Sequence, residues 1–217
     1  MAPVRTSVLL ALVLLVAAQP ARAVSLVNGS FEDDALAADS FCVSFAAPLC
    51  ASLTGWSGDV YLVNGSPGPI APQLPIPDGE QFAMIQSTAV MQQSVTIDVA
   101  GSYRLTWSDA GRAHYIGANG NASYDVSFDG TVLGSYDTVT GSPWASHSLT
   151  FHANAGVFTL EIAGTTPASA GDNSALLDAF VLVPEPSALC LDAAALALLA
   201  CRSAALRRRA RRGGRGR

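Results

Sequence analysis

Apolar and polar side chains alternate with a period of two along four runs of the chain. This alternation is typical of β-strands that bury one face and expose the other. Each run is therefore predicted to be a strand packed against a core. The apolar positions are Val95, Ile97 and Val99 in the first run, Tyr103, Leu105 and Trp107 in the second, Tyr124, Val126 and Phe128 in the third, and Phe158, Leu160 and Ile162 in the fourth.

Turn residues separate these runs at short intervals. Asp129-Gly130 predicts a hairpin, because both positions tolerate a positive φ. No stretch of helical period and length occurs between residues 24 and 183, and roughly nine or ten short strands predict an all-β, antiparallel β-sandwich of the jelly-roll type. Further strands are predicted near residues 59–63, 80–86, 146–152 and 175–183.

The first 23 residues follow a different pattern. Residues 7–18 are apolar behind a single Arg5, and Ala21-Arg22-Ala23 supplies a small-x-small cleavage site. A membrane anchor is the alternative, but this run is shorter than the roughly 20 residues that span a bilayer. We therefore predict a helical secretory signal peptide that signal peptidase removes.

Beyond the last predicted strand the alternation stops. Pro184 and Pro186 cannot donate to a sheet, so they end that strand. Residues 187–206 are rich in Ala and Leu and predict a single transmembrane helix, and the arginines that follow predict a cytoplasmic stop by the positive-inside rule. A nucleic-acid-binding tail is the alternative, which the position after an apolar helix disfavours. The predicted stop comprises Arg207, Arg208, Arg209, Arg211 and Arg212.

The order Pro184-Glu185-Pro186, apolar segment and terminal arginines resembles the PEP-CTERM sorting signal of Gram-negative bacteria. The resemblance implies recognition by an exosortase, a membrane-embedded transpeptidase, with cleavage near the Pro-Glu-Pro motif. It also implies delivery to the cell surface or to an exopolysaccharide matrix, with the C-terminal helix as a temporary anchor in the membrane.

Charge divides the chain as sharply as the hydrophobic pattern does. Residues 24–183 hold two arginines and fifteen acidic side chains, a net charge of −13, whereas eight of the twelve arginines lie between Arg202 and Arg217. A domain this acidic repels nucleic acid, so we expect no nucleic-acid partner. Its carboxylates are suited to a hard cation such as Ca²⁺.

Four cysteines occur as two separated pairs. Cys42 and Cys50 close a short loop of the central domain, whereas Cys190 and Cys201 lie in the apolar C-terminal segment. Three pairings are possible, and an oxidising compartment favours the local disulfide between Cys42 and Cys50. Such a bridge restrains one loop rather than the whole fold.

The two ends of the central domain carry a second resemblance. Residues 26–32, LVNGSFE, followed by Gly55-Trp56, are similar to the opening of galactose-binding-like β-sandwiches, which include carbohydrate-binding modules. Residues 176–181, LLDAFV, resemble the closing strand of those domains. The resemblance implies that the first and last strands are neighbours and often hold a structural calcium ion.

Glu32 and Asp178 are the carboxylates that match this implied calcium site. Ca²⁺ takes about six to eight oxygen ligands, so other oxygens must complete its shell. The alternative is that both acids are ordinary surface charges or turn-capping groups.

Sugar binding requires exposed aromatic side chains beside polar groups. Trp107 alternates with core residues and is predicted to be buried. Trp56, Tyr115 and Trp144 occupy loop-like positions and form the candidate ligand platform. The alternative is that these three side chains are lids that close the ends of the sandwich.

Catalytic motifs are absent from the sequence. It has no G-x-S-x-G elbow, no H-E-x-x-H motif and no phosphate-binding glycine loop. His147 and His152 are five positions apart, so they are predicted to point to opposite faces of one strand. Paired carboxylates for glycoside hydrolysis stay open among the fifteen acids, with no pair preferred.

We therefore predict one exported β-sandwich, residues 24–183, between a signal peptide (1–23) and a sorting segment (184–217). Its predicted role is non-enzymatic binding of extracellular polysaccharide, or a structural part in the polysaccharide matrix. The alternatives are a surface glycan hydrolase and an adhesion module that recognises protein.

Overall fold

The fold was described from a computed structural model of the chain. Residues 23–184 belong to one compact unit. The predicted signal helix, the predicted transmembrane helix and the arginine stop lie outside the described residues. The described residues are 24, 26–43, 53–66, 68, 70, 72, 74–113, 121–168 and 173–185.

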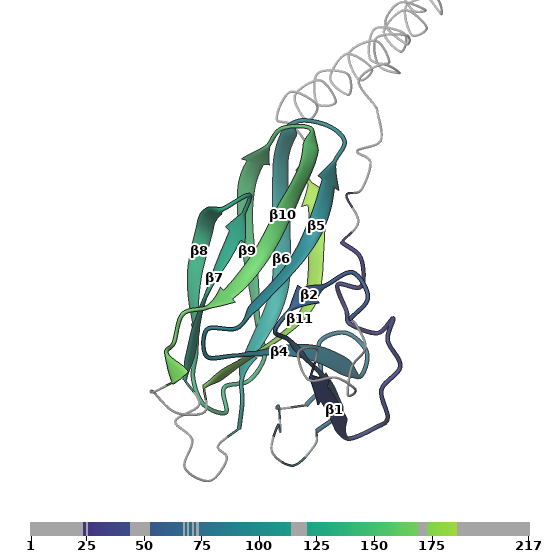
Figure 1. Ribbon diagram of the computed structural model, residues 1–217, viewed down its shortest axis with the longest axis vertical. Coiled ribbons are helices and arrows are strands. Elements are labelled where there is room, and N and C mark those ends of the chain that lie inside the picture. Colours follow the sequence, from purple (N-terminus) through teal and green to yellow (C-terminus); the bar gives the residue numbers. More distant parts are fainter. Residues whose placement is uncertain are drawn as a thin grey trace, which may run out of the picture. The chain divides into compact units, whose positions relative to one another are not determined.

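The described residues form two antiparallel sheets packed face to face (Figure 1). This arrangement confirms the predicted all-β antiparallel sandwich. The six-stranded sheet has the order β1 (Ser40–Val43), β3 (Tyr61–Asn64), β4 (Gln81–Gln86), β11 (Ser174–Pro184), β6 (Gly101–Gly111) and β9 (Ala145–Ala153). The five-stranded sheet has the order β2 (Ser57–Gly58), β5 (Val90–Ile97), β10 (Gly156–Gly164), β7 (Ala122–Phe128) and β8 (Thr131–Thr138).

The inner core lies between the two sheets and follows the predicted alternation. On β6, Tyr103, Leu105 and Trp107 are all buried, as expected for one face of a strand. One predicted core position is wrong, because Val99 follows the end of β5 and is 64 % exposed. The core positions contributed by β5, β7 and β10 include Val95, Ile97, Tyr124, Val126, Phe128, Leu160 and Ile162.

A second hydrophobic cluster covers the outer face of the six-stranded sheet. We call this cluster the outer core; its buried members are Val63, Ile70, Phe82, Met84, Ala110 and Leu176. Ile70 comes from the proline-rich connection between β3 and β4, and Ile76 of the same connection packs against the cluster. As a result β4 is buried on both faces, which explains why its sequence, QFAMIQ, does not alternate clearly.

The last strand contains an irregularity that joins it to the start of the domain. Its register with β6 shifts between Asp178 and Val181, and Ala179 adopts a positive φ of 56°. Opposite this bulge, the Phe180 N–H donates to the Gly29 carbonyl over 2.8 Å. A Cβ atom on Gly29 would lie 2.1 Å from the Phe180 carbonyl oxygen, so only glycine allows this approach.

Two further predictions concern features at the limits of the described residues. Cys42 on β1 is buried and disulfide-bonded, whereas its predicted partner Cys50 lies outside the described part, so the pairing stays a prediction. No helix among the described residues is long and apolar enough to cross a membrane.

Candidate functional site

The predicted calcium ligand Asp178 lies fully buried at the bulge of β11. Its two carboxylate oxygens accept hydrogen bonds from the backbone N–H groups of Asp78 at 3.0 Å and Ala179 at 2.6 Å. Burial raises the pKa of this carboxyl to about 7, and the nearby charges of Asp78 and Glu32 act in the same direction.

The second predicted ligand, Glu32, holds the same segment as Asp178, namely residues 78–81, which lead into β4. Its Oε1 atom accepts the backbone N–H groups of Glu80 at 2.7 Å and Gln81 at 2.6 Å. A Cβ atom on Gly79 would lie 2.3 Å from this oxygen, and Gly79 has a φ of 75°. The two carboxylates therefore hold the backbone that enters β4.

Among the described residues, Glu32 and Asp178 are not part of a ready-made group of calcium ligands. Both carboxylates face backbone N–H donors, and the described residues contain no group of three or more His, Cys, Asp or Glu side chains that could hold a metal ion. Ca²⁺ takes about six to eight oxygens. Calcium stays a prediction for experiment, and the observed role of both acids is to position a loop.

Asn28 links the opening motif of the domain to neighbouring loops. Its Nδ2 group donates to Asp34 Oδ2 at 3.1 Å and to the Thr54 carbonyl at 3.2 Å, and its Oδ1 accepts the Asp33 N–H at 3.0 Å. Its carbonyl accepts the indole N–H of Trp56 at 3.0 Å. The residues that carry the galactose-binding-like resemblance thus have an architectural role here.

The ligand-platform prediction is wrong for Trp56. This side chain is only 5 % exposed, and its ring packs against Phe31 and Phe180 with centroid distances of 5.6 and 5.4 Å. A buried ring of this kind closes the core, as the alternative prediction states. Tyr115 lies outside the described residues. Trp144 is therefore the member of the predicted platform that the structure leaves accessible.

Trp144 borders a hollow of about 370 Å³ on the outer face of the six-stranded sheet. We call it the Trp144 hollow. The half-buried indole packs edge-on against Phe82 of the outer core, with a centroid distance of 5.6 Å and an interplanar angle of 76°. The hydroxyl groups of Ser108 and Ser146 lie 3.4 Å apart in the same wall. The hollow is lined by Leu74, Pro75, Ile76, Pro77, Ser108, Pro143, Trp144 and Ser146.

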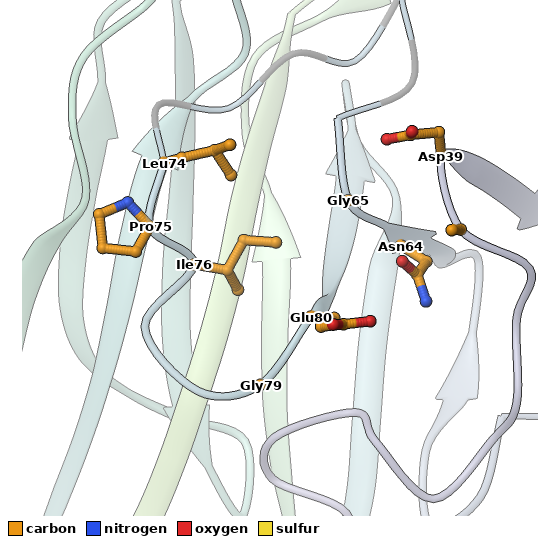
Figure 2. A pocket seen from close by; sticks show the side chains of 9 residues that line it. Asp39, Asn64, Gly65, Leu74, Pro75, Ile76, Gly79 and Glu80 are labelled. Carbon is orange, nitrogen blue, oxygen red and sulfur yellow. The ribbon is translucent and has the colours of Figure 1, made fainter.

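A second hollow of about 410 Å³ lies across the same loop (Figure 2). We call it the Asp39 hollow. Leu74, Pro75 and Ile76 line both hollows and form an apolar ridge between them. The remaining lining residues of the Asp39 hollow are Ala38, Asp39, Asn64, Gly65, Gly79 and Glu80. Sequence reasoning missed both hollows, because the proline-rich connection gives no periodic pattern that reveals what it covers.

Sequence reasoning also missed a polar network inside the sandwich. The buried Asp109 accepts the Tyr124 hydroxyl at 2.7 Å, and its other oxygen lies 2.8 Å from His147 Nε2. The Trp107 indole N–H donates to the same Tyr124 oxygen at 2.9 Å. Burial raises the pKa of Tyr124 far above its ordinary value, so this hydroxyl stays protonated as a donor.

The two histidines take the directions predicted for them. His147 on β9 points inward and stacks on Trp107 with a centroid distance of 5.2 Å, whereas His152 is exposed. The polar network lines neither of the two hollows. Its observed contacts therefore connect β6 and β9 of one sheet with β7 of the other.

The sorting motif begins inside the last strand. Pro184 is the final residue of β11 and lies opposite Tyr103 of β6. Glu185 follows it directly, and Pro186 lies outside the described residues. The sandwich therefore ends where the predicted sorting segment starts.

Comparison with known proteins identifies a family and a shared fold. The family described as "Protein of unknown function (DUF642)" matches residues 24–182. An apo-form cyclase from Fischerella sp. superposes with a TM-score of 0.57 and 14 % identity, covering 76 % of this chain and 97 % of that one. A Stig cyclase from Fischerella sp. TAU, in complex with an indole compound, superposes with a TM-score of 0.55 and 16 % identity. The match covers 76 % of this chain and 98 % of that one. At these identities the likeness shows the fold alone.

A carbohydrate-binding module is also similar, at a lower level. TmCBM61 in complex with beta-1,4-galactotriose gives a TM-score of 0.42 and 22 % identity, covering 61 % of this chain and 90 % of that one. This TM-score is too low to carry an argument. No curated protein matches the chain.

Proposed function

The chain belongs to the DUF642 family, and we propose that it binds carbohydrate, without catalysis, at the Trp144 hollow. One observation carries this proposal: the half-buried Trp144 lines the same hollow as Ser108 and Ser146, whose hydroxyl groups lie 3.4 Å apart. An indole face offers a flat apolar contact for a sugar ring. Hydroxyl groups that can donate or accept are suited to orienting the hydroxyls of a sugar.

The surroundings of the hollow support a preformed site. Trp144 rests against Phe82, and Pro143 restricts the backbone immediately before it. Pro75 and Pro77 also line the hollow and restrict its backbone, and Glu32 and Asp178 hold the segment that follows them. A rigid wall loses little conformational entropy when a ligand binds.

Export and sorting complete the proposal. Signal peptidase removes residues 1–23, and an exosortase cleaves near Pro184, Glu185 and Pro186, which places the sandwich at the cell surface or in the exopolysaccharide matrix of a Gram-negative bacterium. Support comes from the position of the motif, since β11 ends at Pro184. Cleavage beyond this point removes no strand of the described sandwich. Intact mass and cell fractionation of the native protein test both cleavages.

Glycan-array binding of the purified processed protein tests the molecular activity. The variant Trp144→Ala should lower affinity for any glycan bound by about tenfold or more, because buried Trp contacts often dominate binding. Phe41→Ala is the matched control, since Phe41 is 40 % exposed on β1 and lines neither hollow. Equal affinity of wild type and Trp144→Ala rejects this site, and release of shortened glycan products rejects the non-catalytic role.

A further inference from the structure

Two acidic residues line the Asp39 hollow, Asp39 and Glu80, and both contact Gly65, Asp39 through its carboxylate and Glu80 through its backbone carbonyl. Gly65 donates its N–H to the Glu80 carbonyl at 2.9 Å, so Glu80 is its neighbour across the hairpin. On the other side, Asp39 Oδ1 accepts the Ser66 N–H at 3.0 Å and would lie 2.7 Å from a Cβ atom on Gly65. Glu80 is exposed, and Figure 2 shows Asp39, Asn64 and Glu80 around the same opening.

Asn64 adds a third acceptor to this hollow. Its side chain lines the cavity although the residue is only 8 % exposed. Its Nδ2 group is used internally, because it donates to the Leu36 carbonyl at 3.0 Å. Its Oδ1 atom accepts no hydrogen bond from any described residue. An amide oxygen that accepts no hydrogen bond from the protein can accept one from a ligand that supplies an N–H or O–H group.

The side chains of the hollow therefore offer acceptors and negative charge. None of the described residues that line it is basic. Glu32 adds a further carboxylate next to Gly79 at the edge of the hollow. Clustered carboxylates of one sign raise the local concentration of cations. The ridge of Leu74, Pro75 and Ile76 supplies an apolar surface beside these charges, and Leu74 is 66 % exposed.

We propose that the Asp39 hollow binds an amino sugar, with its ammonium group between Asp39 and Glu80 and its ring against the ridge. An ammonium group has three donors and no acceptor, which matches two carboxylates and the amide oxygen of Asn64. This inference rests on the proposed carbohydrate binding, because the ridge is shared with the Trp144 hollow. One polysaccharide chain that crosses the ridge contacts both hollows, and the Asp39 hollow selects chains with free amino groups.

Binding of two trisaccharides to the processed protein tests the inference. One probe is a trimer of β-1,4-linked glucosamine, and the other is its N-acetylated form, which has the same backbone without the charge. The amino trimer should bind about fivefold more tightly at low salt, and this preference should shrink at high salt because the charges are exposed. Glu80→Gln and Asp39→Asn should each reduce the preference. Asp39→Asn keeps an oxygen that can accept the Ser66 N–H.

Trp144→Ala separates the two proposals, because it should weaken both trimers and leave their ratio unchanged. Equal binding of the two trimers, or an unchanged ratio in Glu80→Gln, overturns the amino-sugar inference and leaves carbohydrate binding intact if Trp144 still matters. If Trp144→Ala binds both trimers as tightly as wild type, the proposed function is contradicted instead. Tighter binding of an oligolysine peptide than of the amino trimer, with the same dependence on Glu80, assigns the hollow to a basic peptide and also overturns the inference.

Discussion

The inner core and the outer core of this sandwich are both hydrophobic, but they arise from different kinds of sequence. The inner core is built by strands whose apolar residues alternate, such as β5 and β6. The outer core forms because a proline-rich connection lies on the outer face of one sheet. The inner core holds the two sheets together. The outer core instead supports Ile76 and Trp144, which line the hollow proposed as the binding site.

The largest expected effect comes from one truncation in each core. Leu105→Ala and Phe82→Ala should each lower the free energy of unfolding by about 3–4 kcal/mol, since both side chains are fully buried. Only Phe82→Ala should also weaken glycan binding, because Trp144 packs on Phe82. Denaturant unfolding and glycan titration measure the two effects. Equal loss of binding in both variants would show that the cores are not separable.

The next expected effect is a dependence of the free energy of unfolding on pH. It is caused by Asp178, which holds the loop between the two hollows through the Asp78 N–H. The pKa of Asp178 is raised from 3.8 to about 7 in the folded protein, so its contribution to stability is full below pH 3.8 and is lost as pH rises through about 7. At about 1.4 kcal/mol for each pKa unit, the rise from 3.8 to about 7 corresponds to a change on the order of 4 kcal/mol. Unfolding of wild type between pH 4 and pH 8 should show this loss.

The control for that titration is Asp178→Asn, which cannot ionise. Its free energy of unfolding should change less between pH 4 and pH 8 than that of wild type. In Asp178→Asn one of the two positions that face backbone N–H groups is an NH2 group, which cannot accept, so the variant should be less stable than wild type at pH 4. If the free energy of unfolding changed with pH by the same amount in both proteins, the raised pKa of Asp178 would be contradicted.

A smaller effect is expected from the polar network of the inner core. Tyr124→Phe removes the donor to Asp109 Oδ2 and the acceptor of the Trp107 N–H, which leaves one buried carboxylate oxygen and one buried indole N–H without that partner, while Asp109 Oδ1 keeps its contact with His147. The expected loss is about 2 kcal/mol by denaturant unfolding, with unchanged glycan affinity. A stability within about 0.5 kcal/mol of wild type would mean that the network relaxes around the missing hydroxyl.

The smallest expected effect is that of metal removal. Because Glu32 and Asp178 already accept backbone N–H groups, we expect the melting temperature to be the same with and without a chelator. Thermal melts in EDTA and in millimolar CaCl₂ measure this directly. A melting temperature that rises with calcium and falls with EDTA would restore the sequence prediction of a structural calcium site.

Sequence reasoning succeeded where side chains follow a period. The strands around Tyr103 and Phe158 were predictable because every second residue points to the same face, and the Asp129-Gly130 hairpin was predictable from its turn residues. Neither signal depends on contacts between distant parts of the chain. The same holds for the buried position of Trp107, which was predicted from its alternation with Leu105.

The candidate site was less predictable because it depends on long-range contacts. Trp56 has a loop-like neighbourhood in the sequence, yet Asn28 and Phe180 bury it from distant positions. Ile70 looks like an isolated apolar residue among prolines, and its burial depends on where the connection lies. Trp144 alone of the predicted platform is described and accessible, and its supporting partner Phe82 lies far away in sequence.

The central claim is that carbohydrate binds beside Trp144, and the three indole N–H resonances of the protein test it most directly. Trp56 and Trp107 donate their indole N–H groups to internal acceptors, whereas the Trp144 N–H is buried and has no acceptor among the described residues, so its resonance reports on changes in the packing around this ring. During titration of ¹⁵N-labelled processed protein with a glycan that binds it, the Trp144 resonance should shift while the other two stay in place. A Trp144 resonance that stays fixed at saturating glycan would contradict the account.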